Sequence, residues 1–166
     1  MSRRQCVIII VCMKYDTAAI THKFLLKNSL SVAVAESCTG GLVSKLLTDL
    51  PGSSRFFLMG IVAYNNSVKR KILKVPAAVL AKDGAVSAKT AVLMSRSVRR
   101  ISGADLGIGI TGIAGPGGGS KNKPVGTVFI AVCKKNKVIC KEFHFSGGRG
   151  AVRKKAATKA LQLIHL

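Results

Sequence analysis

Ser37 and its neighbours form a segment with the residue types of a hydrolytic site. Ser37 follows a short apolar run, where a strand is predicted to turn into a helix. Gly40 and Gly41 lack side chains, so a substrate can approach the backbone there closely. Free N–H groups at the start of a helix favour an anion or an oxyanion. The alternative is that Ser37 or Thr39 only caps the helix, and this segment alone favours the cap.

A second pair of serines lies in the next turn. Ser53 and Ser54 directly follow Pro51-Gly52. Either hydroxyl could act as a nucleophile if a base lay nearby. Serine is also common in turns that carry no chemistry, and the residues alone favour that interpretation.

A serine nucleophile needs a base, and here a lysine is a better candidate than a histidine. No Asp or Glu is evidently placed to orient any histidine, so a Ser-His-Asp triad is unsupported. The histidines are His22, His144 and His165. Lys69 could act as a base if burial, or the charges of Arg70 and Lys71, lowered its pKa from about 10.4. The alternative for Lys69 is a solvated surface charge.

Three further features could bind a substrate or assist the chemistry. Tyr64 could relay a proton or donate a hydrogen bond, or simply pack on the core. The glycine-rich loop from Thr111 to Ser120, with Gly112 and Gly115, follows a predicted buried strand and suits a phosphate. It lacks the P-loop order of residues. Arg149 could clamp a phosphate or stand exposed at the surface.

The elements that must position these residues alternate between strands and helices. Strands are predicted at 31–35, 61–64 and 105–110, followed by a hairpin of 125–133 and 138–145. Helices are predicted after Gly41, after the N-cap Ser87 and after the glycine turn at 147–150. The predicted buried positions of the last two helices are Ala91, Met94, Val98, Ile101, Val152, Ala156, Ala160 and Leu163. This order predicts an α/β fold, a three-layer α/β/α sandwich with a mixed sheet.

Composition excludes some functional classes and favours others. The 166 residues include 27 Lys and Arg against 6 Asp and Glu, a net charge of +21, which favours anionic partners. The six acids are scattered, which argues against a two-carboxylate glycosidase or a two-metal site. The five cysteines form no CxxC pair and no zinc spacing, so we expect no metal and reduced thiols in a cytoplasmic protein. The apolar run at 6–13 is too short to span a membrane, and we interpret it as the buried face of a first helix or strand, with a signal sequence as the alternative.

Several ordered motifs together resemble one family, the CinA C-terminal domain or nicotinamide mononucleotide deamidase family. The resemblance covers roughly Leu30 to the end of the chain. Agreement of several motifs in order is far more specific than any single one. The motifs are Ala35-Glu36-Ser37-Cys38-Thr39-Gly40-Gly41, Pro51-Gly52-Ser53-Ser54, Tyr64-Asn65-Asn66-Ser67-Val68-Lys69, Gly84-Ala85-Val86-Ser87, Thr111-Gly112-Ile113-Ala114-Gly115-Pro116 and Lys123-Pro124-Val125-Gly126-Thr127-Val128.

The resemblance implies a single amidase domain over 1–166, with an atypical segment at 1–29. It implies an amidohydrolase of the serine–lysine type that needs no cofactor and deamidates nicotinamide mononucleotide. The implied catalytic residues are Ser54 as nucleophile, Lys69 as base and Tyr64 as helper. Ser37 is the second choice for the nucleophile. The implied substrate-binding residues are Ser37, Thr39, Gly40, Gly41, Thr111, Gly112, Gly115 and Arg149.

Two other interpretations remain open at this point. The first is a noncatalytic domain that binds a nucleotide or phosphate, and the second is a basic nucleic-acid-binding protein. The set of Ser54, Tyr64 and Lys69 favours the enzyme, since a binding module would not need all three. The expected partners are a small nucleotide substrate and a second copy of the chain in a homodimer, with no membrane.

Overall fold

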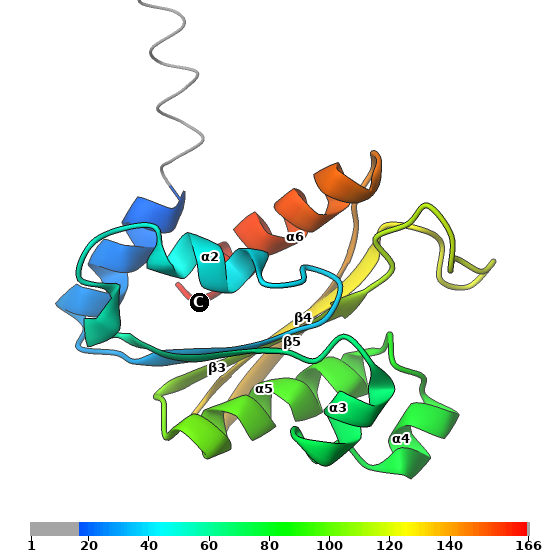
Figure 1. Cartoon of the computed structure of the whole chain (residues 1–166), viewed down its shortest axis with the longest axis horizontal. Coiled ribbons are helices and arrows are strands. Elements are labelled where there is room, and N and C mark those ends of the chain that lie inside the picture. The colour runs from blue at the N-terminus through cyan, green and yellow to red at the C-terminus, as the bar shows by residue number, and fades with distance from the viewer. Residues whose placement is uncertain (1–16, 166) are drawn as a thin grey trace, which may run out of the picture.

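A computed structural model of the chain describes residues 17–165, and a five-stranded mixed sheet lies at its centre (Figure 1). The strand order is β2-β1-β3-β4-β5. β1 pairs in parallel with both β2 and β3, whereas β4 is antiparallel to β3 and to β5. The strands are β1 (Val32–Glu36), β2 (Phe57–Val62), β3 (Leu106–Gly112), β4 (Thr127–Lys134) and β5 (Lys137–His144).

Helices cover both faces of this sheet and complete the three layers (Figure 1). One layer holds the helix at 17–27, α2 (Leu42–Thr48) and α6 (Arg149–Leu163). The other holds α3 (Asn66–Lys71), α4 (Ala77–Lys82) and α5 (Ala88–Ser102). The predicted three-layer α/β/α sandwich with a mixed sheet is therefore confirmed.

The central strand β1 is buried on both faces, as its unbroken apolar run requires. Val32 and Val34 belong to the core cluster that also includes residues of α2 and α6. Ala33 and Ala35 belong to the cluster that includes residues of α4 and α5. Alternate residues of a strand point to opposite faces, so one short strand anchors both helical layers.

The structure confirms most predicted elements and corrects several details. β2 begins four residues earlier than predicted and ends at Val62, so Tyr64 lies in the connection to α3. Ile101 was predicted to be buried, but its side chain is 46% exposed because it lies on the outer side of α5. The short helices α3 and α4 were missed, since six residues give too few turns for a periodic pattern. The predicted element at 6–13 lies outside the described residues.

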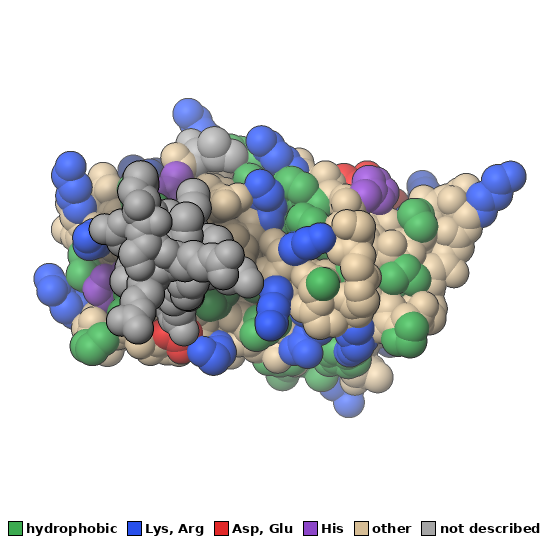
Figure 2. All heavy atoms as spheres, turned by 90° about the horizontal axis from the view of Figure 1, so that it is seen from above, with side chains coloured by type: hydrophobic (Ala, Val, Ile, Leu, Met, Phe, Trp, Pro, Cys, Tyr) green, Lys and Arg blue, Asp and Glu red, His purple; other side chains and the backbone are tan. Residues whose placement is uncertain are grey.

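Basic side chains are distributed over the surface formed by α2 and α6 and do not gather in one patch. Figure 2 shows Lys and Arg spread over this face, with few Asp or Glu among them. Within residues 17–165, no helix has both the length and the apolar composition needed to cross a bilayer.

Candidate active site

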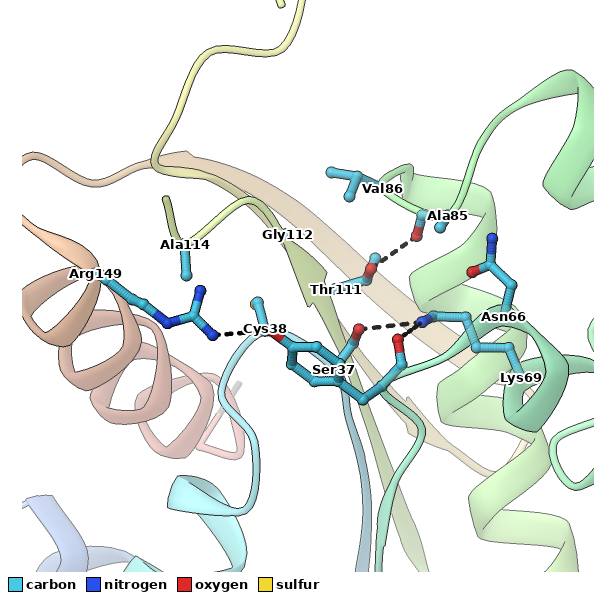
Figure 3. Close-up of a pocket in the computed structure, with 11 residues that line it drawn as sticks. Ser37, Cys38, Asn66, Lys69, Ala85, Val86, Thr111, Gly112, Ala114 and Arg149 are labelled. Carbon is cyan, nitrogen blue, oxygen red and sulfur yellow. Dashed lines mark hydrogen bonds between the residues drawn. The ribbon is translucent and has the colours of Figure 1, made fainter. Parts of the chain in front are cut away.

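A cavity of about 220 Å³ opens where β1 and β3 end. Parallel strands present their carboxyl ends at the same edge of a sheet, which is where open α/β folds bind ligands. Ser37 and Cys38, which directly follow β1, line the cavity together with the last residues of β3. The connection from β2 into α3 forms one wall (Figure 3). The lining residues with polar side chains are Ser37, Cys38, Tyr64, Asn66, Lys69, Thr111 and Arg149.

Lys69 is buried at the bottom of this cavity and contacts Ser37. Its side chain is 1% exposed, and Nζ donates to Ser37 Oγ at 3.1 Å (Figure 3). Nζ also donates to the backbone carbonyls of Ala63 at 2.8 Å and Tyr64 at 3.2 Å. In the described part of the chain no carboxylate pairs with Lys69.

This environment changes the protonation of Lys69. Burial disfavours the charged ammonium and lowers the pKa of Lys69 below its usual 10.5, and a minor opposing effect comes from Cys38. A carboxylate partner would have raised the pKa instead. Lys69 is therefore suited to accept a proton from the hydroxyl of Ser37.

Cys38 lies beside Ser37 but is poorly suited to act as the nucleophile. Burial raises the pKa of its thiol to about 12. The reactive form of cysteine is the thiolate, which is scarce near neutral pH when the pKa is that high. Of the two adjacent side chains, Ser37 is the one with a base in contact.

The position of Ser37 is fixed from both sides. Its backbone N–H donates to the carbonyl of Ile110 in β3 at 2.9 Å. The preceding residue, Glu36, is fully buried, and its carboxylate accepts hydrogen bonds from the N–H groups of Gly41, Val43 and Ser44 and from the Ser44 hydroxyl. The N-cap residue Gly41 has no side chain that could cap α2, so the Glu36 carboxylate accepts the hydrogen bonds of the free N–H groups at the start of this helix. Glu36 thus fixes the loop that follows Ser37.

The loop between Ser37 and α2 needs its two glycines. Gly40 and Gly41 have φ angles of 59° and 95°, in the region that favours glycine. Arg153 of α6 donates to the carbonyl of Thr39 through Nε at 3.2 Å and through a terminal nitrogen at 2.8 Å. A Cβ on Gly40 would come within 3.1 Å of the Arg153 guanidinium. The predicted binding residues Thr39, Gly40 and Gly41 therefore shape the loop beside the cavity, and none of them is among its lining residues.

Arg149 lies at the mouth of the cavity (Figure 3), where it contacts the side chain of Tyr64. One terminal nitrogen of Arg149 donates to the Tyr64 hydroxyl at 2.8 Å, and the other donates to the carbonyl of Gly115 at 2.9 Å. The side chain of Tyr64 is 57% exposed. Its hydroxyl contacts Arg149, whereas Lys69 contacts only the Tyr64 backbone. Tyr64 therefore orients Arg149 in this structure.

The glycine loop contributes mainly through its backbone and one hydroxyl. Thr111 and Gly112 line the cavity, and the Thr111 hydroxyl donates to the carbonyl of Ala85 at 2.7 Å. Gly112 lies so close to β4 that a Cβ would meet the carbonyl oxygen of Thr127 at 2.7 Å. Gly115 acts on the site through its backbone carbonyl, which accepts a hydrogen bond from Arg149.

Ser54 is not among the residues that line the cavity, so the structure does not bring it together with Lys69. Ser54 is exposed in the short 3-10 helix Ser53–Arg55, just before β2 begins, whereas Lys69 follows the end of β2. From its first to its last residue β2 is roughly 16 Å long, five steps of about 3.3 Å, and the two residues lie beyond its opposite ends. Ser54 and Lys69 are only fifteen residues apart in the sequence, but β2 lies between them and holds them at opposite ends of the strand.

The family of this chain can now be stated. Residues 14–166 match the family model of the CinA C-terminal domain. The chain belongs to the CinA C-terminal domain family. A solved structure of the competence/damage inducible protein CihA from Agrobacterium tumefaciens superposes with a TM-score of 0.89 at 38% identity, covering 92% of this chain and 93% of that chain. The corresponding ComA protein of Klebsiella pneumoniae has a TM-score of 0.88 at 32% identity, covering 91% and 94%.

Relatives in sequence carry general names. A "Putative competence-damage inducible protein" of Desulforudis audaxviator is 49% identical over 140 residues, which are 84% of this chain and 34% of the relative. A "CinA-like protein" of Geobacter sulfurreducens is 47% identical over 149 residues, 90% of this chain and 36% of the relative. The chain thus spans about a third of the length of these curated relatives.

Three residues of the site were not singled out by the analysis of the sequence. Glu36 and Arg153 act on the Ser37 loop through hydrogen bonds, and Asn66 lines the cavity. Asn66 precedes Lys69 by three residues, a spacing that places both side chains on one face of a helix. This spacing could have pointed to Asn66 only if a helix had been predicted at α3. Contacts such as the one between Arg153 and Thr39, 114 residues apart, leave no local pattern.

Proposed function

We propose that this CinA-family chain is a serine–lysine amidohydrolase that converts nicotinamide mononucleotide to nicotinic acid mononucleotide and ammonia. The observation that carries the proposal is the buried Lys69 ammonium 3.1 Å from the hydroxyl of Ser37, with its pKa lowered by burial. A lysine that can lose its proton next to a serine is the arrangement that serine–lysine hydrolysis requires.

In the proposed first step, Ser37 Oγ attacks the carboxamide carbon and Lys69 accepts the hydroxyl proton. The carbonyl oxygen becomes an oxyanion. The backbone N–H groups of Cys38 and Thr39 lie near the Cys38 sulfur and have no oxygen acceptor among the described residues, and in this proposal they donate to the oxyanion instead. Lys69 then returns the proton to the departing nitrogen, ammonia leaves, and an ester to Ser37 remains.

In the second step, water enters after ammonia has left and hydrolyses the ester to Ser37. Lys69 takes a proton from water while the water oxygen bonds to the ester carbon. The bond from that carbon to Ser37 Oγ then breaks, Lys69 returns the proton to Oγ, and the acid product leaves and loses its own proton to solvent. In each step Lys69 first accepts a proton and then gives it back, so it acts as base and then as acid and ends the cycle in its starting protonation state.

Arg149 supports an anionic nucleotide as the substrate. Its guanidinium has five N–H donors, and the two hydrogen bonds to Gly115 and Tyr64 leave others free at the cavity mouth. Arg149 is also the first residue of α6, and a helix N-terminus favours a phosphate. We therefore propose that Arg149 binds the 5′-phosphate while the carboxamide enters towards Ser37.

The proposal is tested by following ammonia and nucleotide products with the purified protein and nicotinamide mononucleotide. The wild-type chain should release the acid nucleotide and ammonia in equal amounts. Ser37→Ala should lower kcat/KM by at least about 10³-fold, since it removes the nucleophile and leaves the fold intact. Ser54→Ala is the matched control, because Ser54 is an exposed serine outside the cavity.

Two outcomes would overturn this proposal in different ways. Nucleotide binding by the wild-type chain without ammonia release would favour a noncatalytic binding domain. Loss of turnover in Ser54→Ala with full turnover in Ser37→Ala would mean that the wrong serine has been assigned.

A further inference from the structure

Asn66 is the polar residue of the cavity whose role the contacts above leave open. Ser37, Thr111, Tyr64 and Arg149 each have a hydrogen-bond partner. Among the described residues, none forms a hydrogen bond with the side-chain amide of Asn66, although Asn66 lines the cavity. Figure 3 shows this amide above the Lys69 side chain and next to Ala85, with the Lys69 nitrogen between it and Ser37.

The preceding asparagine provides a contrast within the same turn. The side chain of Asn65 accepts a hydrogen bond from the N–H of Ser67 at 2.8 Å and caps the start of α3. Asn65 therefore has a structural role that Asn66 does not share. Two adjacent residues of the same type thus face different surroundings, one the helix terminus and the other the cavity.

The position of Asn66 on α3 relates it to one atom of the substrate. Asn66 and Lys69 are three residues apart on this helix, so their Cβ atoms lie about 5–6 Å apart on one face. In the proposed mechanism, Lys69 gives a proton to the departing nitrogen, which must therefore lie near Nζ. The same nitrogen then lies within reach of the side chain of Asn66.

We infer that Asn66 recognises the NH2 group of the carboxamide, its Oδ1 accepting a hydrogen bond from the departing nitrogen. No partner fixes the orientation of the side-chain amide, so Oδ1 is free to turn towards this N–H. An ester or a carboxylate at the same position has no N–H to donate. Asn66 would thus be a specificity residue that favours the amide substrate over its ester analogue and over the acid product. This inference rests on the proposed amidase function.

The test compares two substrates that differ only in the leaving group. The kcat/KM values for nicotinamide mononucleotide and for the methyl ester of nicotinic acid mononucleotide are measured for wild type, Asn66→Ala and Asn65→Ala. For Asn66→Ala we expect the ratio of amide to ester kcat/KM to fall about tenfold, the size of one lost hydrogen bond. Asn65→Ala should lower the melting temperature through loss of the cap but leave this ratio at the wild-type value.

The outcomes separate this inference from the function on which it rests. If the wild-type chain cleaves both substrates and Asn66→Ala lowers both kcat/KM values equally, or neither, the role of Asn66 is wrong and the amidase stands. The same conclusion follows if Asn65→Ala changes the ratio as much as Asn66→Ala. If the wild-type chain cleaves neither substrate, the amidase proposal and this inference both fail.

Discussion

At the scale of single residues, the chemistry of this site depends on what surrounds Lys69. Twenty-seven basic residues occur in the chain, and Lys69 is the lysine that the fold buries against a serine hydroxyl and two carbonyls. Solvation keeps an exposed lysine charged near neutral pH, whereas burial makes the neutral form accessible. The residue type was available from the sequence, but its burial is a property of the fold.

The pH dependence of the reaction follows from the lowered pKa of Lys69. Only neutral Lys69 can accept the proton of Ser37, and the neutral fraction increases as pH rises towards the pKa. We expect log kcat/KM to rise with a slope of about one per pH unit and to level off at a pH below 10.5. Rates measured at intervals of pH on the wild-type enzyme check this.

A variant provides the control for that profile. Lys69→Arg keeps a positive charge but cannot lose its proton, since the pKa of arginine is above about 12. This variant should lack the pH-dependent rate at every pH. A wild-type rate that falls with rising pH over the same interval would exclude Lys69 as the base.

Sequence analysis predicted the members of the site better than their arrangement. Lys69, Tyr64, Ser37, Thr111, Gly112 and Arg149 were all singled out, and all line one cavity. Ser54 was preferred to Ser37 as the nucleophile, because the sequence around each serine does not reveal its distance from Lys69. That distance depends on which end of β2 each residue occupies.

At the scale of elements, the site depends on how closely α5 packs on β3. Gly107 and Gly109 lie opposite the backbone of α5, and a Cβ on Gly109 would come within 2.2 Å of the carbonyl oxygen of Ala91. The glycines of β3 therefore set the distance between this strand and the helix. β3 carries Thr111 and Gly112 at its end, so the same packing determines where one wall of the cavity lies.

Replacing one of these glycines should destabilise the whole fold. Gly109→Ala places a methyl group against backbone atoms of α5, which must move away, and we expect a loss of about 3 kcal/mol in the free energy of unfolding. Denaturant unfolding of the purified variant measures this loss.

The glycine loop offers a matched control for this substitution. A Cβ on Gly117 would meet nothing within 4 Å, so Gly117→Ala should change the free energy of unfolding by less than about 0.5 kcal/mol. Equal stability of the two variants would mean that α5 does not pack on β3 as described.

Element prediction succeeded where hydrophobic pattern and turn residues agreed. Ser87 caps α5 through the N–H of Thr90, and the hairpin of β4 and β5 turns at Lys135 and Asn136 as expected. The bounds of β2 were predicted less well, and alternate residues of this edge strand, such as Leu58 and Val62, are exposed. An apolar residue on an exposed edge gives the same signal in the sequence as a buried one.

At the scale of the whole molecule, the net charge of +21 indicates a broad class of anionic partners, whereas the cavity indicates a narrower one. Lys and Arg are spread over the face shown in Figure 2, and spread charge attracts any anion. The lining of the cavity is more selective. Among the described residues that line it, the charged side chains are Lys69 and Arg149, one beside Ser37 and one at the mouth. This arrangement suits a small molecule with one anionic group and an amide.

The layered architecture follows from the sequence because each layer has a local signal. The apolar β1, the glycines after it, the amphipathic helix α5 and the glycine turn before α6 suffice to predict a three-layer fold. The contacts that close the site join distant segments, as when Arg149 reaches Tyr64 across 85 residues. Such contacts depend on the whole fold and have no counterpart in any local pattern.

The most direct test of the central claim is to trap the covalent intermediate and find which residue carries it. The wild-type enzyme is mixed with nicotinamide mononucleotide, quenched in acid within the first turnovers and digested for peptide mass spectrometry. The account predicts a substrate acyl group, formed with loss of ammonia, on the peptide that contains Ser37, and none in Ser37→Ala. The same acyl group on the peptide that contains Ser54, or on Cys38, would contradict the account.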